Sequence, residues 1–453
     1  MAKRGVRFLC SECGASFPRW SGRCPNCGRW DALEEVEEEP RPAERGAVSS
    51  APARAWRLDE VGEEPRERIG TGVPELDRVL GGGILPGSTV LLGGDPGIGK
   101  STIILQTMCK VATSGHKCLY VTCEESLPQV RLRARRLGLA GSPLQLVSET
   151  SLEPICAALA EHGPDVAAID SIQMVSSGAL DATVGSVTQL KACASELIRQ
   201  AKTQGFCLFL VGHVTKEGVI AGPRLLEHMV DTVLYFESDR FHALRLLRAT
   251  KNRFGSTGEL GVFEMTEEGL RDVANPSEFF LAERDPRQSG SVVTAAIEGN
   301  RALLVEIQAL VGPSAYGTPE RRTTGLDYRR VSMMLSVLER RGGLSLGGCD
   351  VFVNVAGGVH LVEPAADLPL VLALAGSLKD RPFPEATAAG GEVGLGGEVR
   401  SVGRMDRRLA EAGRMGFRRA IVPAGSAAAA RGSGVQVVPV RHLRQALDLL
   451  DAP

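Results

Sequence analysis

A glycine-rich loop that ends in lysine and serine carries the strongest chemical signal in this chain. Residues 94–101 read Gly-Asp-Pro-Gly-Ile-Gly-Lys-Ser, the pattern G-x-x-x-x-G-K-S. In such a loop the glycines let backbone N–H groups turn toward a polyphosphate, and the helix that follows adds its partial positive charge. Lys100 can reach the β- and γ-phosphates, and the Ser101 hydroxyl can ligate Mg²⁺. An apolar run before the loop predicts a strand and the run 102–108 predicts a helix, so we expect a nucleotide to bind here.

Carboxylates at the ends of two further apolar runs could complete the site. The run 166–169 ends in Asp170, seventy residues after Lys100, where such a carboxylate would serve Mg²⁺. Glu124 and Glu125 follow the run 118–122, and one of the two is expected to polarise the attacking water. The alternative for this pair is an exposed acidic turn. The sequence does not choose cleanly between them, and we prefer Glu124.

Two later polar clusters are weaker candidates. His213 follows the apolar run 208–212 and is either a sensor of the γ-phosphate or a structural histidine. Lys251 and Arg253 lie two residues apart after the run 244–249, so an extended backbone would project them to one side. They are either an exposed basic turn or a pair that reaches a neighbouring subunit's γ-phosphate as an arginine finger.

The first segment of the chain carries a metal-ligand pattern. Two C-x-x-C pairs, Cys10 with Cys13 and Cys24 with Cys27, are separated by ten residues and each is followed by glycine. Four thiolates close a tetrahedral shell with no open position, which predicts a structural zinc ribbon over residues 1–33. Rubredoxin-type iron and two redox-active pairs are the alternatives. The other seven cysteines are scattered through apolar stretches and are expected to be reduced core residues.

Length and composition bound the rest. A chain of 453 residues should form two to four domains, because single cores rarely exceed about 250–300 residues. With a net charge of −2, nucleic-acid binding would have to come from local basic patches. We find no signal peptide and no run long enough to span a membrane, so a cytoplasmic protein is expected. An acidic, Pro-bearing linker at 34–56 precedes alternating strand and helix patterns over 57–275, typical of an α/β parallel sheet. Residues 276–453 have short strands and glycine turns.

In this order the motifs closely resemble the bacterial RadA/Sms family, and the resemblance covers essentially the whole chain. Its most specific element is the pentapeptide Lys-Asn-Arg-Phe-Gly at 251–255. The resemblance implies an α/β fold: a RecA-like phosphate-loop ATPase core, an N-terminal zinc ribbon and a C-terminal α+β domain like that of Lon protease. It assigns Lys251 and Arg253 to ATP turnover and DNA work, Asp170 to Mg²⁺, and nucleotide binding to Gly94, Asp95, Pro96, Gly97, Ile98, Gly99, Lys100, Ser101 and Thr102.

The same resemblance implies the biological role. The family consists of ring-forming, DNA-stimulated ATPases that promote branch migration together with the RecA recombinase. We therefore expect a hexameric ring, with single-stranded and branched DNA as partners and ATP, Mg²⁺ and Zn²⁺ as cofactors. Loops at 176–185 and 217–224 match the positions where RecA-like rings contact single strands. The rival hypothesis is a regulatory RecA-like ATPase that acts on a protein partner without moving along DNA.

The C-terminal domain is expected to lack protease chemistry. Lon proteases use a Ser–Lys dyad, and by this resemblance Ala366 stands at the serine and Asp406 at the lysine. Alanine cannot be acylated, and a carboxylate is no amine base, so we interpret residues 276–453 as a non-proteolytic scaffold. This domain also has an arginine-rich stretch that either binds duplex phosphates or is a solvated face, with Arg400, Arg404, Arg407, Arg408, Arg414, Arg418 and Arg419.

Overall fold

The computed structural model describes most of the chain as two compact units. The described residues are 6–12, 15–17, 19–37, 57, 67–212, 223–238, 244–314, 317–430 and 432–451. One unit comprises residues 1–72 and 82–234, and the other comprises residues 73–81 and 235–453. No helix among the described residues has the length and apolar character needed to cross a bilayer. The domain boundaries expected from the sequence remain predictions.

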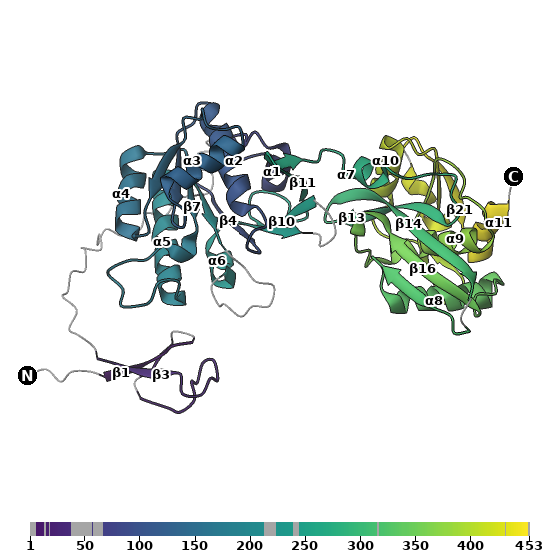
Figure 1. Cartoon of the computed structure of the whole chain (residues 1–453), viewed down its shortest axis with the longest axis horizontal. Helices are drawn as coiled ribbons and strands as arrows, with labels where there is room; N and C mark the ends of the chain where they lie inside the picture. The colour runs from purple at the N-terminus through teal and green to yellow at the C-terminus, as the bar shows by residue number, and fades with distance from the viewer. Residues whose placement is uncertain are drawn as a thin grey trace, which may run out of the picture. The chain divides into compact units, whose positions relative to one another are not determined.

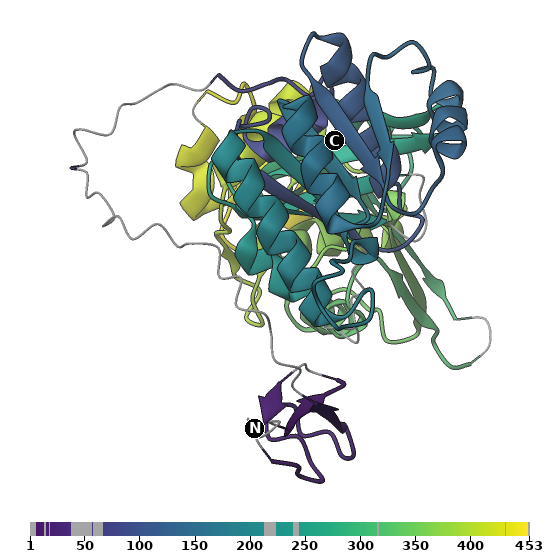
Figure 2. The same ribbon diagram turned by 90° about the vertical axis from the view of Figure 1, so that its left-hand side faces the viewer.

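The N-terminal segment forms a small antiparallel sheet (Figure 2). Its strand β1 (Val6–Cys10) pairs with β2 (Ser16–Phe17) on one side and with β3 (Leu33–Glu37) on the other. Two of the four fully buried apolar residues in its core are cysteines, Cys10 and Cys24. So small an apolar core favours a segment that needs a metal ion to fold.

Five parallel strands of a nine-stranded sheet form the core of the first unit, with helices packed against them (Figure 1). These strands, in spatial order, are β4 (Thr89–Gly94), β8 (Cys207–Val211), β7 (Val166–Asp170), β5 (Cys118–Thr122) and β6 (Gln145–Ser148). The helices are α2 (Lys100–Thr113), α3 (Leu127–Arg136), α4 (Leu152–His162), α5 (Val187–Gln204) and α6 (Pro223–Met229). All but the edge strand β6 are buried throughout, as their continuous apolar runs predict. The α/β core with a parallel sheet is therefore confirmed, and its carboxyl ends bring the predicted site residues together.

The loop between β7 and α5 is organised around one buried side chain. The Gln189 amide nitrogen donates to the carbonyl oxygens of Ser177, Leu180 and Ala182, at 3.1, 3.3 and 3.0 Å. Its amide oxygen accepts from the Ser177 backbone N–H at 2.9 Å. The segment 176–185, which the resemblance matches to a DNA-contacting loop, thus has a defined conformation.

The remaining strands of the nine-stranded sheet are β9 to β12, and one small helix packs on them. Strand β9 (Thr232–Ser238) begins in the first unit and ends in the second. After it, β11 (Leu260–Thr266) pairs with β10 (Leu244–Asn252) and with β12 (Gly269–Asp272). Helix α1 (Pro74–Leu80) packs on β10 and β11, closely enough that a Cβ at Gly261 would lie 2.9 Å from the Glu75 carbonyl oxygen.

The rest of the second unit is a mixed seven-stranded sheet with helices (Figure 1). The strand order is β15 (Arg321–Thr324), β16 (Cys349–Val355), β14 (Arg301–Pro313), β13 (Ser291–Glu298), β17 (Thr387–Ala389), β20 (Arg419–Pro423) and β21 (Gln436–Val440). A separate two-stranded sheet joins β18 (Glu392–Val393) to β19 (Val399–Arg400). The helices are α7 (Pro276–Leu281), α8 (Tyr328–Val337), α9 (Asp367–Leu378), α10 (Met405–Arg414) and α11 (Leu443–Asp451). Helix α9 is almost wholly apolar and lies buried against β13 and β14, in the middle of the largest apolar cluster.

Candidate nucleotide site

The phosphate loop joins the buried strand β4 to helix α2. Gly97 and Gly99 have φ angles of 75° and 114°, which side-chain-bearing residues rarely adopt. A Cβ on Gly97 would meet nothing within 4 Å, so the loop is open on that side. Lys100 is the first residue of α2, and the loop therefore leads directly into a helix N-terminus that favours anions.

Lys100 is held under the loop by backbone carbonyl groups. Its Nζ donates to the carbonyl oxygens of Gly94 at 2.7 Å and Asp95 at 2.8 Å, and only 4% of its surface is exposed. Burial lowers the pKa of Lys100, although the charges of Asp170, Asp95 and Glu124 act to raise it. A phosphate would add negative charge beside this buried ammonium group and stabilise its protonated form.

Asp170 is the last residue of strand β7. It lies near Lys100 and is buried. The Tyr120 hydroxyl, from the neighbouring strand β5, donates to Asp170 Oδ2 at 2.5 Å. Burial, followed by the Asp170 charge, raises the pKa of Tyr120 well above its ordinary value, so the hydroxyl remains a proton donor. A carboxylate and the Ser101 hydroxyl offer the oxygen ligands that Mg²⁺ prefers, and these residues fit the predicted magnesium site.

The two glutamates that follow β5 have different partners. Glu124 is exposed, and its Oε1 accepts a hydrogen bond from the hydroxyl of Ser171, the residue next to Asp170. Glu125 instead forms an ion pair with Arg133 of helix α3. Glu124 therefore lies near Asp170, the predicted magnesium ligand, and near Lys100, while the Glu125 charge is paired with Arg133. This geometry favours Glu124 as the residue that activates water.

Of the other predicted site residues, some belong to the second unit and some fall outside the described residues. His213 and residues 217–222 belong to the latter group, as does Cys13 of the ribbon. Lys251 and Arg253 belong to the second unit, where Lys251 is half-buried and Arg253 exposed. Between them the buried Asn252 side chain donates to the carbonyl oxygens of Val79 and Leu80, at 3.4 and 3.3 Å. Sequence reasoning missed Asn252, although its place inside a specific pentapeptide was a signal.

Three of the four predicted zinc ligands converge. The Sγ atoms of Cys10, Cys24 and Cys27 lie within 4.8 Å of one another, and those of Cys10 and Cys27 are 3.7 Å apart. Four sulfurs placed tetrahedrally at ~2.3 Å from zinc would be separated by about 3.8 Å. The described residues therefore fit a tetrathiolate metal site, with Cys13 predicted to be the fourth ligand.

The cysteines of the first unit's sheet behave differently. Burial raises the pKa of Cys118, Cys123 and Cys207 to about 12 in each case. These thiols stay protonated at neutral pH and are poor nucleophiles and poor metal ligands. They match the expectation of reduced core residues.

A cavity of about 410 Å³ in the second unit lies at the stretch that the sequence analysis matched to the serine of a Lon-type dyad. Its lining includes Glu363, Pro364 and Ala365. Lon proteases carry their serine in the sequence Gly-Pro-Ser-Ala-Gly, directly after proline, and Ala365 directly follows Pro364 and lines the cavity, so we match Ala365 rather than Ala366 to the serine. The chemical conclusion is unchanged because both residues are alanine. Asp406 is exposed on α10 and does not line the cavity.

An ion pair between the buried Arg408 and the half-buried Glu363 borders this cavity. Arg408 is only 5% exposed, and its guanidinium contacts both carboxylate oxygens of Glu363, with Nη1 at 2.9 Å from Oε1. Glu363 Oε1 also accepts from the Ile297 backbone N–H at 2.9 Å. The expectation that the arginine-rich stretch is a solvated or phosphate-binding face is thus wrong for Arg408, because its charge is neutralised inside the domain.

A second internal pair holds the start of α9. The Nε atom of Arg330 donates to the Asp367 carboxylate at 2.7 Å, and the Val393 backbone N–H donates to the same group at 3.1 Å. Asp367 is 2% exposed and is the first residue of the helix, where a negative charge is favourable.

Comparison with known proteins gives matches over almost the whole chain. Residues 63–219 match a family model described as an AAA domain, and residues 8–35 match one described as a rubredoxin metal binding domain. The chain is 52% identical to the DNA repair protein RadA of Pseudomonas aeruginosa, over 99% of this chain and 100% of that protein. It is 48% identical to the DNA repair protein RadA of Bacillus subtilis, over 99% of each, and to that of Escherichia coli, over 100% of each.

Proposed function

The chain belongs to the RadA family of DNA repair proteins, and from that premise we propose that it is a DNA-stimulated ATPase that works as a ring-shaped motor on recombination intermediates. The proposed activity is branch migration together with the RecA recombinase. The proposed partners are single-stranded and branched DNA, the oligomer is a hexameric ring, and the location is the cytoplasm.

The cluster of Lys100, Asp170 and Glu124 carries this proposal. Lys100 would neutralise charge on the β- and γ-phosphates, and Ser101 with Asp170 would hold Mg²⁺. Glu124, fixed by the Ser171 hydroxyl, would accept a hydrogen bond from the attacking water and orient it. Mg²⁺ supplies charge stabilisation on the transferred phosphoryl group when bound. Lys251 and Arg253 are proposed to act in trans on the nucleotide of a neighbouring subunit.

The C-terminal domain is proposed to be a non-proteolytic scaffold. Ala365 has no hydroxyl to acylate, and the Arg408–Glu363 pair borders the cavity where a dyad would work. Casein and unfolded peptides are expected to survive incubation with the protein and ATP.

The rate of ATP hydrolysis with and without single-stranded DNA tests the motor proposal, beside negative-stain imaging of particle symmetry. We expect stimulation by DNA and ring-shaped particles. An ATPase whose rate ignores DNA but responds to a protein partner would support the regulatory alternative.

Mixing two inactive variants tests the shared site. Arg253→Ala should bind ATP but not hydrolyse it, and Lys100→Ala should lack the phosphate contact. In a mixed ring some interfaces pair an intact Lys100 with an intact Arg253, so partial activity should return. No recovery in a mixture shown to co-assemble would contradict action in trans.

Zinc is proposed for the cysteine site, at one ion per chain. Elemental analysis of gently purified protein checks this, and iron in place of zinc would support the rubredoxin-type alternative. Serine at Cys24 should abolish metal binding, while serine at the buried Cys207 should leave the metal content unchanged.

A further inference from the structure

The tip of the β13–β14 hairpin lies against the turn that follows the Lys251–Gly255 segment. The Asn300 backbone N–H donates to the Gly258 carbonyl oxygen at 2.5 Å. The Asn300 side-chain nitrogen donates to Ser256 Oγ at 2.5 Å and to Glu259 Oε1 at 3.2 Å. A Cβ on Gly258 would lie 2.8 Å from the Asn300 side chain, so position 258 has no room for one. The C-terminal domain therefore fixes the far end of this segment directly.

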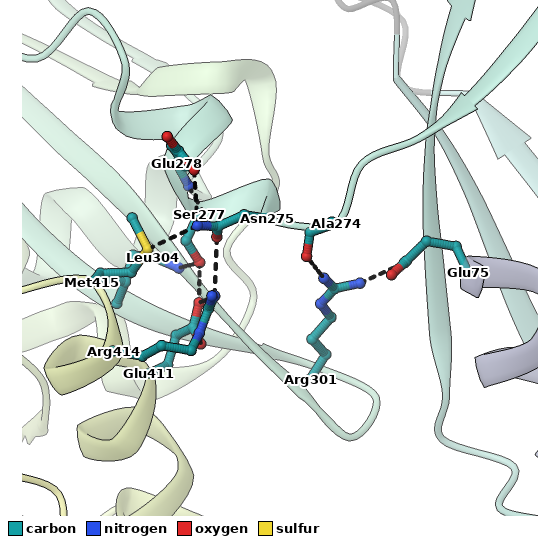
Figure 3. Close-up of polar contacts among 10 residues, drawn as sticks. All are labelled: Glu75, Ala274, Asn275, Ser277, Glu278, Arg301, Leu304, Glu411, Arg414 and Met415. Carbon is teal, nitrogen blue, oxygen red and sulfur yellow. Dashed lines mark hydrogen bonds and ion pairs between the residues drawn. The ribbon is translucent and has the colours of Figure 1, made fainter.

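The next residue of the hairpin, Arg301, holds helix α1 (Figure 3). Its Nη1 contacts Glu75 Oε2 at 2.6 Å, and its Nη2 donates to the Ala274 carbonyl oxygen at 2.9 Å. The Glu75 side chain is 3% exposed and also accepts from the Val262 backbone N–H at 2.9 Å. A buried carboxylate depends strongly on its partners, so Arg301 fixes the start of α1.

The end of α1 in turn supports the near end of the segment. Asn252 donates to the last carbonyl groups of the helix and accepts from the Phe254 backbone N–H at 3.0 Å. Gly255 approaches Gly81, the C-cap of α1, so closely that a Cβ would lie 3.3 Å from the Gly81 Cα atom. Residues 252–255 are thus held by the end of α1, and Asn300 holds the turn 256–259 that follows them directly.

Two arginines of the arginine-rich stretch, Arg404 and Arg407, form hydrogen bonds with the tip of the β13–β14 hairpin. Arg404 Nη1 donates to Asn300 Oδ1 at 2.9 Å and also contacts the Gly299 carbonyl oxygen. Arg407 Nη1 donates to the Asn300 carbonyl oxygen at 2.6 Å. These guanidinium groups therefore have an internal use that neither phosphate binding nor a solvated face requires.

We propose that Asn300 and Arg301 are positioning residues for Lys251 and Arg253, and that Arg404 and Arg407 act with them by fixing Asn300. In this arrangement the C-terminal domain sets the conformation of the segment that serves ATP turnover. The inference rests on the proposed role of Lys251 and Arg253 in hydrolysis.

Steady-state ATPase kinetics of the full-length protein test the proposal. Asn300→Ala should lower kcat by about 10-fold to 10²-fold, because a small displacement of a catalytic group costs that much, while ATP affinity stays unchanged. Arg414→Ala is the matched control, because Arg414 belongs to the same domain but contacts Glu411 and Asn275 instead of the segment (Figure 3). The control should keep normal kcat, and equal losses in both variants would overturn the proposal.

Asn300→Asp distinguishes the hydrogen bonds donated by the Asn300 amide nitrogen from the one accepted by its amide oxygen. Aspartate keeps the acceptor for Arg404 but replaces the amide donor with a carboxylate beside that of Glu259. We expect kcat to fall as it does in Asn300→Ala. Normal turnover in a folded Asn300→Asp variant would show that the side-chain bonds to Ser256 and Glu259 are dispensable, and would overturn the proposal.

Combination with Arg253→Ala distinguishes positioning from general damage. Arg253→Ala should have no steady-state turnover, so the comparison uses its residual single-turnover rate of ATP cleavage at excess enzyme. If Asn300 acts through Arg253, adding Asn300→Ala to Arg253→Ala should not lower that residual rate further. A further loss of the full single-variant size would contradict the proposal.

Amide hydrogen exchange gives a readout that does not depend on hydrolysis. Asn300→Ala should speed exchange at residues 253–259 and leave residues 94–102 unchanged, and Arg414→Ala should change neither. If Arg253→Ala hydrolyses ATP normally, the proposed function of Arg253 fails by itself. In that case the hydrogen exchange still decides whether Asn300 holds the segment, and unchanged exchange overturns the inference.

Discussion

Lys100 in the first unit and Arg408 in the second are both buried cations, but their positive charges have different kinds of partner. Lys100 hydrogen-bonds to backbone carbonyl oxygens, and burial lowers its pKa in spite of three nearby carboxylates. Arg408 makes a bidentate pair with Glu363 and also donates to the Ala295 carbonyl oxygen. The Lys100 charge lies under the phosphate loop, where it can bind a phosphate, while the Arg408 charge is neutralised by the Glu363 carboxylate. The difference separates a site that binds a ligand from one that stabilises a fold.

Removing the Lys100 charge should have the largest effect, which is on ATP turnover. Lys100→Ala should reduce ATP turnover by about 10³-fold, since phosphoryl transfer depends mainly on positioning and on stabilisation of charge. Steady-state hydrolysis at saturating Mg²⁺ and ATP measures the loss. Lys110→Ala, on the same helix, is the control and should keep normal kcat. Near-normal turnover in purified Lys100→Ala would contradict the nucleotide site.

Removing the Arg408 charge should instead lower the stability of the fold. Arg408→Met should lower the free energy of unfolding by about 1–3 kcal/mol, because the half-buried Glu363 is left without its cation. Chemical denaturation followed by circular dichroism measures the change. The double variant Arg408→Met with Glu363→Gln should recover most of the loss, because the amide oxygen still accepts from Ile297. The exposed Arg418→Ala should stay within about 0.5 kcal/mol of the unmodified protein, and an equal loss there would undo the contrast.

Lys100→Met should have the opposite sign to Arg408→Met in nucleotide-free protein. Because the folded-state pKa of Lys100 is lowered, its charged form costs stability, and methionine removes that cost. We expect a rise of a few degrees in Tm. The cost is fully present below the folded-state pKa and disappears as the pH rises toward 10.5, the ordinary lysine value. The Tm difference should therefore shrink between pH 7 and pH 10, and a Tm lower than that of the unmodified protein would reverse the comparison.

The smallest effect is expected from restoring a nucleophile at the C-terminal cavity. Ala365→Ser should show no peptidase activity, because no amine base accompanies the new hydroxyl. Adding Asp406→Lys should not change this result, since position 406 is exposed and does not line the cavity. A fluorogenic peptide assay checks both variants. Cleavage by either one would show that the Arg408–Glu363 pair does not prevent the chemistry.

The nucleotide site could be predicted because its determinants are local in the chain. A strand, a glycine turn, Lys100 and a helix follow one another, and Asp170 ends a recognisable apolar strand, so spacing alone indicated the cluster. The same patterns supported the family resemblance, which the relatives confirm. The choice between Glu124 and Glu125 needed the structure. It depends on the hydrogen bond from Ser171 to Glu124 and on the ion pair of Glu125 with Arg133, and no spacing rule in the sequence predicts either contact.

The arginine-rich stretch shows why the rest could not be predicted. Composition alone made seven arginines look equivalent. The structure buries Arg408 against Glu363, and places Arg404 and Arg407 on the hairpin tip. Their partners lie 45 or more residues away, and no periodicity links such positions.

The loop between β7 and α5 has an evolutionary consequence. Its conformation is maintained by the buried Gln189, which donates to three of the loop's carbonyl groups and accepts from one of its amides. The outward residues Asp181, Thr183 and Val184 are exposed and take no part in those bonds. Substitutions there can accumulate without loss of the loop's shape, whereas a change at Gln189 would alter every position together. Selection can therefore vary what this loop contacts while one interior amide preserves how the loop is presented.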